Sequence, residues 1–160
     1  MKTIKKEAYF EVYENIEELP TAVSDLMAQA AKARLRAYAP YSNFLVGAAI
    51  LLDNGEVITG NNQENASYPS GLCAERTAIY YAGSQFPDAK IVQMALIAGS
   101  ENHKTTTPIP PCGACRQAIA EYEIKQSAPI DIYFMGESGE VMRSQSLSNL
   151  LPLVFEKSVL

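Results

Sequence analysis

One run of nine apolar residues stands out in the first half of the chain: Phe44-Leu45-Val46-Gly47-Ala48-Ala49-Ile50-Leu51-Leu52. A run of this length without polar alternation is typical of a strand that is buried on both faces. The small residues of Gly47-Ala48-Ala49 predict that a helix packs closely on this strand. The turn signal Asp53-Asn54-Gly55 follows and leads into a second strand over residues 56–61, so the two strands are predicted to form a hairpin.

Helical and extended patterns alternate along the rest of the chain. Apolar residues recur at spacings of three and four from Thr21 to Tyr38, which indicates an amphipathic helix that ends before Pro40. Further helices are expected over residues 73–83, 112–122 and 146–151, and further strands over residues 91–98, 130–135 and 140–143. This alternation predicts an α/β fold, a three-layer α/β/α domain built on a mixed five-stranded sheet.

The length of 160 residues fits a single domain with a sizeable core. Residues 1–20 carry only a weak strand signal, and we interpret them as an N-terminal extension. Residues 21–160 are then one domain. No internal repeat or low-complexity segment divides them.

The charge balance excludes some partners. A formal net charge of −5 argues against nucleic acid, because phosphate binding needs a basic face. Lys32, Arg34 and Arg36 alternate along one helix, and we expect them to form a solvated face. The longest apolar run is too short to cross a bilayer, and no apolar segment follows the basic N-terminus. We therefore expect a cytoplasmic protein without a membrane partner.

The chain has three cysteines, in the blocks Cys73-Ala74-Glu75 and Cys112-Gly113-Ala114-Cys115. Three thiolates can bind zinc and leave the fourth tetrahedral position open, as in a catalytic rather than a structural zinc site. The single histidine, His103, lies in a polar loop and is expected to be exposed. We therefore predict one Zn²⁺ per subunit, bound by Cys73, Cys112 and Cys115.

One other interpretation of the cysteines remains open at this point. Cys112 and Cys115 could be a redox pair, with Cys73 a small buried side chain. A proline before Cys112 and a glutamate near Cys73 favour zinc instead. Residues two apart in a helix point in different directions, so Cys73 and Glu75 can share one site only if Cys73 stands at the mouth of its helix.

Three thiolates on one Zn²⁺ leave a net negative charge, which makes a bound water less acidic than three imidazoles would. A neighbouring cation would compensate for this. Arg76 is the candidate, since a guanidinium can donate hydrogen bonds to the ligand sulfurs.

These blocks resemble those of the zinc-dependent cytidine and deoxycytidylate deaminases, in the short three-cysteine form. The resemblance covers residues 21–155. It rests on five stretches: Tyr41–Ala49, Asn62–Pro69, Cys73-Ala74-Glu75-Arg76-Thr77-Ala78, Pro111-Cys112-Gly113-Ala114-Cys115-Arg116-Gln117, and Leu150-Leu151-Pro152 with Phe155.

The resemblance implies roles for individual residues. Phe44 would pack on the pyrimidine, and the backbone of Ala74 would contact the base carbonyl. Asn62 and Glu64 would bind the ribose 3′-hydroxyl, and their spacing of two in an extended segment does place them on the same side. The resemblance also implies a homotetramer, in which Tyr68 and Phe155 match positions near the pocket of a neighbouring subunit. We count Tyr68 with the substrate-binding residues.

The activity implied is the hydrolytic deamination of cytidine and 2′-deoxycytidine to uridine and 2′-deoxyuridine with release of ammonia, a reaction of pyrimidine salvage. Glu75 would carry protons between water, base and leaving amine. Two alternatives are a deaminase of the same fold that acts on another aminated base or nucleotide, and a non-enzymatic zinc-binding module.

Overall fold

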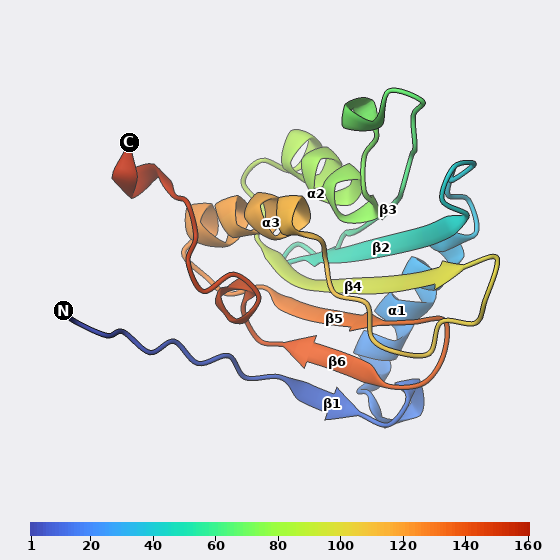
Figure 1. Ribbon diagram of the computed structural model, residues 1–160, viewed down its shortest axis with the longest axis horizontal. Helices are drawn as coiled ribbons and strands as arrows, with labels where there is room; N and C mark the ends of the chain where they lie inside the picture. The colour runs from blue at the N-terminus through green and yellow to red at the C-terminus, as the bar shows by residue number, and fades with distance from the viewer.

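The computed structural model describes residues 1–160 and shows three layers (Figure 1). A mixed sheet forms the middle layer. Helix α1 (Thr21–Arg34) covers one face, while α2 (Ala74–Gln85) and α3 (Gly113–Gln126) cover the other. The predicted α/β/α architecture is confirmed. None of the helices combines the length and the apolar character needed to cross a membrane.

The sheet has six strands in the order β1-β6-β5-β4-β2-β3, and only the β4–β5 pair is parallel. The strands are β1 (Glu11–Tyr13), β2 (Phe44–Leu52), β3 (Val57–Asn61), β4 (Ile91–Ser100), β5 (Asp131–Met135) and β6 (Val141–Ser144). Short 3₁₀ helices cover η1 (Ile16–Glu18), η2 (Tyr68–Ser70), η3 (Leu147–Asn149) and η4 (Lys157–Val159).

The prediction of five strands was wrong because the N-terminal extension contributes a sixth. Strand β1 pairs antiparallel with β6, with Glu11 opposite Arg143 and Tyr13 opposite Val141. It is an edge strand of three residues with little burial. A strand of this kind carries little of the apolar signal by which strands are found in a sequence.

Strand β2 is buried on both faces, as its continuous apolar sequence predicts. Ala48, Ile50 and Leu52 pack in the core under α2 and α3, whereas Ala49 packs in the core under α1. Gly47 lies directly beneath α1, where an added Cβ would collide with the carbonyl oxygen of Ala30. The predicted close approach of a helix to this strand is confirmed.

Helix α1 ends at Arg34, four residues before the predicted end. The backbone of Tyr38 instead bonds to the segment after β3: its N–H donates to Asn62 O (3.0 Å), and its carbonyl accepts from Glu64 N (2.8 Å). These tertiary hydrogen bonds outweigh the helical periodicity of the preceding residues. They also hold Asn62 and Glu64 next to the start of β2.

Arg34 does not belong to a solvated face. Its side chain is only 12% exposed, and its Nη2 lies 2.8 Å from Glu137 Oε1. Its Nε donates to Leu45 O (3.2 Å), and Glu137 accepts from the backbone N–H of Thr105 (3.2 Å). The prediction was wrong for this arginine, because helical spacing alone does not reveal a carboxylate supplied by the distant turn between β5 and β6.

We expect the substitution Gly47→Ala to lower the free energy of unfolding by about 2 kcal/mol, because the new methyl group overpacks the β2–α1 contact. The nearest atoms are backbone atoms, including Arg34 N at 2.5 Å, which cannot swing away as a flexible side chain can. Denaturant unfolding measures the change. Gly113→Ala is the matched control, since a Cβ there meets nothing within 4 Å. The free energy of unfolding of this control variant should equal or exceed that of the parent.

Candidate active site

The three cysteines lie at the first turns of two helices. Cys73 is the N-cap of α2 and Cys112 is the N-cap of α3, and neither side chain caps its helix. Cys115 lies in the first turn of α3 and is fully buried. The prediction that Cys73 stands at a helix mouth is confirmed. Both helices direct the positive ends of their dipoles at the sulfurs, which stabilises thiolates.

The geometry of the three sulfurs fits a single zinc ion. Cys73 Sγ lies 3.9 Å from Cys112 Sγ, and Cys112 Sγ lies 3.5 Å from Cys115 Sγ. All three atoms lie within 4.8 Å of one another. Sulfurs bound at about 2.3 Å to one tetrahedral ion would be about 3.8 Å apart. The interpretation of Cys73 as an isolated apolar side chain is therefore wrong.

Arg76 contacts this cluster from the first turn of α2. Its Nη2 donates to Cys73 Sγ at 3.5 Å, and its buried Nε has no partner. The pKa of Cys73 is lowered to about 5, first by hydrogen bonding with Cys115 and then by the hydrogen bond from Arg76, against the raising effect of burial. The guanidinium therefore stabilises negative charge on the sulfurs.

Glu75 is the buried carboxyl group of the site, with only 5% of the residue exposed. Burial raises its pKa above the ordinary value, and the charge of Cys73 adds to the effect. A carboxyl group shifted in this direction holds a proton more readily near neutral pH. It is thus suited to both accepting and returning a proton.

One cavity of about 290 Å³ joins Glu75 to the sulfur cluster. It contains six of the predicted site residues: Phe44, Asn62, Glu64, Cys73, Glu75 and Cys112. The remaining lining residues are Ser42, Val46, Leu96, Ala98, Ile109 and Pro110. The cavity thus has an apolar wall, a polar end at Asn62 and Glu64, and a reactive end at Glu75.

Asn62 is held by the backbone of β2. Its Oδ1 accepts from Val46 N (2.8 Å), and its Nδ2 donates to Phe44 O (2.9 Å). One N–H and one lone pair of the amide remain free, because a carboxamide offers two of each. The side chain therefore keeps a donor and an acceptor for a ligand while its orientation is fixed.

Glu64 is held by the residues that precede β2. Its carboxylate accepts from the N–H groups of Tyr41 (2.9 Å) and Ser42 (3.2 Å) and from the Ser42 hydroxyl (2.5 Å). Burial acts to raise the pKa of Glu64, but these hydrogen bonds together outweigh it and hold the pKa below the usual range. Glu64 is thus an oriented anion at the polar end of the cavity.

A second cavity of about 390 Å³ adjoins the first and shares Ser42, Asn62, Glu64 and Cys73 with it. Tyr68 lines this outer cavity, its ring centroid 6.0 Å from that of Tyr41, and the residue is 75% exposed. Arg76 lines it as well.

Residues 20–128 match the family model described as the cytidine and deoxycytidylate deaminase zinc-binding region. The chain belongs to this family. It is 43% identical over 132 residues to a cytidine deaminase of Halalkalibacterium halodurans, covering 81% of this chain and 91% of the relative. It is 38% identical over 135 residues to a cytidine deaminase of Sporosarcina psychrophila, covering 84% and 92%. The fold is similar to the crystal structure of cytidine deaminase from Burkholderia pseudomallei, with TM-score 0.71, 36% identity, and 86% and 100% of the chains covered.

Membership of this zinc-dependent deaminase family agrees with the three-sulfur cluster. Not every predicted residue lies at the cavity, however. Ala74 is fully buried behind its lining, and Phe155 is 62% exposed on the C-terminal tail, held through its backbone oxygen by Gln117 Nε2 (2.7 Å). His103 is exposed in its loop, as expected.

Sequence reasoning missed residues that shape the cavity without reacting. Ser42 orients Glu64, and Ile109 and Pro110 form part of the apolar wall. Pro110 directly precedes the Pro-Cys motif, so proximity to Cys112 was an available signal. Ser42 carried no such signal, because its partner lies 22 residues away.

Proposed function

We propose that this protein catalyses the hydrolytic deamination of cytidine and 2′-deoxycytidine, consuming water and giving uridine or 2′-deoxyuridine and ammonia. The observation that carries the proposal is the buried carboxyl group of Glu75, which lines one cavity with Cys73 and Cys112, two members of the cluster of three convergent sulfurs. The relatives named cytidine deaminase support a nucleoside as the substrate.

Cys73, Cys112 and Cys115 would hold the zinc ion, and their number leaves a fourth position for the reaction. Zinc, when bound, acts as a Lewis acid that makes water a nucleophile near neutral pH. The two helix N-termini and Arg76 offset the charge of the three sulfurs.

Glu75 accepts a proton from the attacking water and delivers it to N3 of the base, so that C4 becomes open to attack. After addition at C4, the second proton of the water passes through Glu75 to the amino group. The C4–N bond then breaks and ammonia leaves. A pKa raised by burial suits a group that accepts and donates in the same turnover.

The other residues of the cavity orient the nucleoside. Phe44 would pack against the pyrimidine ring. The resemblance also assigns the backbone of Ala74 to the base carbonyl, although Ala74 is fully buried and does not line the cavity. Asn62 offers its free N–H and lone pair, and Glu64 its carboxylate, to a sugar hydroxyl, which both donates and accepts. The 3′-hydroxyl is present in both ribose and deoxyribose, so this pair does not distinguish cytidine from 2′-deoxycytidine.

Tyr68 and Phe155 would act in a homotetramer, each beside the pocket of a neighbouring subunit. Their exposure of 75% and 62% in the single chain supports this assignment, because large aromatic side chains of this kind are enriched at interfaces. The cytoplasmic location stays a prediction.

The experiment that tests the proposal measures ammonia release by the purified protein from cytidine, 2′-deoxycytidine, adenosine and cytosine, together with its zinc content. We expect one zinc per chain and turnover of the two cytosine nucleosides. Zinc-loaded protein that turns over only adenosine or free cytosine would support the same-fold alternative. Loaded protein inert on all four substrates would overturn the proposal.

We expect Glu75→Gln to keep its zinc and to lower kcat by about 10²–10⁴-fold, the usual effect of removing a positioned proton carrier. The amide has a similar shape and cannot exchange the proton. Steady-state kinetics on cytidine and metal analysis of the same sample test this. A kcat within threefold of the parent would remove Glu75 from the mechanism.

We expect Arg76→Ala to raise the apparent pKa of the pH–rate profile, because the sulfurs lose a donor that stabilises their negative charge. The uncompensated charge of the sulfurs makes water harder to deprotonate. The increase of activity with pH should therefore occur at a higher pH than in the parent. Arg36→Ala removes the same charge from an exposed position and is the control. Two coincident profiles would reject the compensating role of Arg76.

A further inference from the structure

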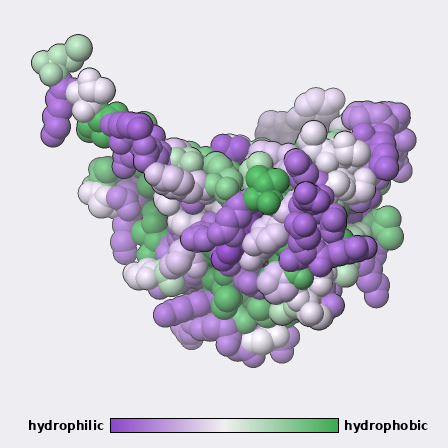
Figure 2. Space-filling view, turned by 90° about the horizontal axis from the view of Figure 1, so that it is seen from below, coloured by the Kyte–Doolittle hydropathy of each residue, from purple (hydrophilic) through white to green (hydrophobic).

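Part of the N-terminal extension is attached to the domain, although the family match begins only at residue 20. Residues 1–8 form an exposed arm that stands away from the body (Figure 2). Residues 9–13 instead follow the edge of the sheet along β6, and we refer to them as the N-terminal brace. Its last three residues are β1, which pairs with β6.

Polar side chains attach the brace on one face of the sheet. Glu11 accepts from Arg143 Nη1 (2.7 Å) and Gln145 Nε2 (2.7 Å), and Arg143 also bonds to Asp131 on β5 (2.8 Å). The hydrogen bond from Arg143 holds the pKa of Glu11 below its ordinary value. The backbone N–H of Tyr9 donates to Asn149 Oδ1 (3.1 Å) and fixes the other end.

Phe10 lies on the opposite face, because neighbouring residues of an extended chain project to alternate sides. This is the face that carries α2 and α3. Phe10 lines a groove of about 310 Å³ there, and the other lining residues are Pro108, Pro110, Arg116, Phe134, Met142, Asn149 and Leu150.

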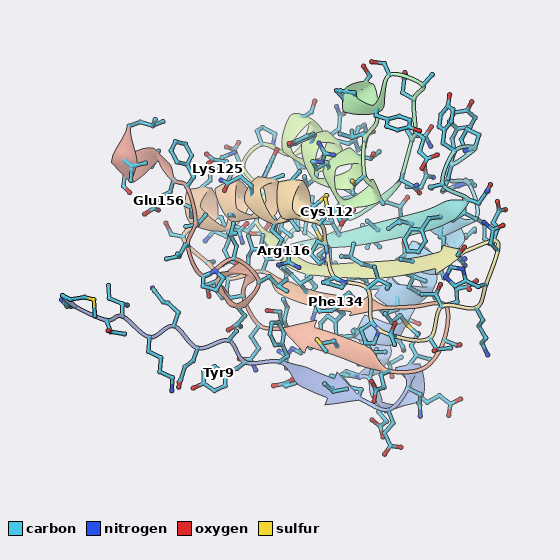
Figure 3. The ribbon with its side chains drawn as sticks, in the orientation of Figure 1. Tyr9, Cys112, Arg116, Lys125, Phe134 and Glu156 are labelled. Carbon is cyan, nitrogen blue, oxygen red and sulfur yellow. The ribbon has the colours of Figure 1, made fainter.

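The opposite wall of this groove is the segment that carries Cys112. Pro110 lines both the groove and the cavity of Glu75. Arg116 donates from Nε to Pro111 O (2.8 Å) and from Nη1 to Leu150 O (2.9 Å). Figure 3 shows Cys112 at the start of α3, with Arg116 and Phe134 between that helix and the sheet. The brace therefore closes one side of a groove whose other side supports a zinc ligand.

We propose that the N-terminal brace is a positioning element for the zinc-binding segment at residues 108–112, with Phe10 facing Pro108 and Pro110 in the shared groove and Glu11 as its attachment. The inference rests on the proposed function, since it assumes that Cys112 binds zinc. Phe10 touches neither substrate nor metal. It limits the movement of Pro108 and Pro110 and so keeps Cys112 in reach of the other two sulfurs.

The test compares zinc release to a chelator from the loaded parent, Phe10→Ala and Val12→Ala. Val12 is the matched control because it is also apolar, lies on the same face of the brace and pairs with Met142, but does not line the groove. We expect Phe10→Ala to release zinc about tenfold faster, at the lower end of the effect of groups that support metal ligands. Val12→Ala should release it at the parental rate, and Phe10→Tyr should restore that rate.

Amide hydrogen exchange separates positioning from general destabilisation. In Phe10→Ala, exchange should increase over residues 108–116, while β2 and β4 stay as protected as in the parent. Glu11→Gln, which keeps Phe10 but weakens the attachment, should give a smaller change at the same residues. The brace has no positioning role if Phe10→Ala and Val12→Ala release zinc equally fast, or if neither differs from the parent. A parent that binds no zinc would instead count against the proposed function.

Discussion

Three sulfurs lie within 4.8 Å of one another, and the fold is arranged around the need to hold them together, because as three thiolates on one ion they would repel. Two of the sulfurs belong to residues that precede helices, and the third belongs to a first turn. This arrangement requires α2 and α3 to begin next to each other on one face of the sheet (Figure 1). The positive ends of both helices and the guanidinium of Arg76 then oppose the repulsion. Neither helix could be shifted by a turn without breaking the cluster.

The sheet fixes where those helices begin. Strand β2 has to be apolar on both sides because α1 covers one face and α2 and α3 the other. The absence of a side chain at Gly47 lets α1 approach the backbone, and the core residues Ala48 and Ala49 are small as well. The residues that flank β2 then serve the cavity: Phe44 begins the strand and Ser42 precedes it. One strand therefore provides both the centre of the core and one wall of the active site.

The layers of the fold and the sulfur cluster could be predicted from sequence because their signals are local. A continuous apolar run, a hairpin turn and the spacing of three cysteines each lie within a few residues. Contacts between distant segments were not predictable in this way. Arg34 looked like a surface residue because Glu137, its partner, is 103 residues away. The edge strand β1 gave only a weak signal and was not counted in the predicted sheet, because Arg143 and Gln145, which bond to Glu11, lie 132 and 134 residues away in the sequence. The hydrogen bonds of Glu64 to Ser42 belong to the same class.

The amide of Asn62 has a further consequence. Strand β3 ends at Asn61. Beyond it, the side chain of Asn62 makes hydrogen bonds to Phe44 O and Val46 N of the kind that the backbone of a longer β3 would make with β2. The start of β2 at Phe44 and the amide proposed to bind the sugar are therefore one mechanical unit. In the proposed function, a substitution at position 62 that selects a different sugar would also disturb the Phe44 ring proposed to meet the base, so the two specificities would not diverge independently.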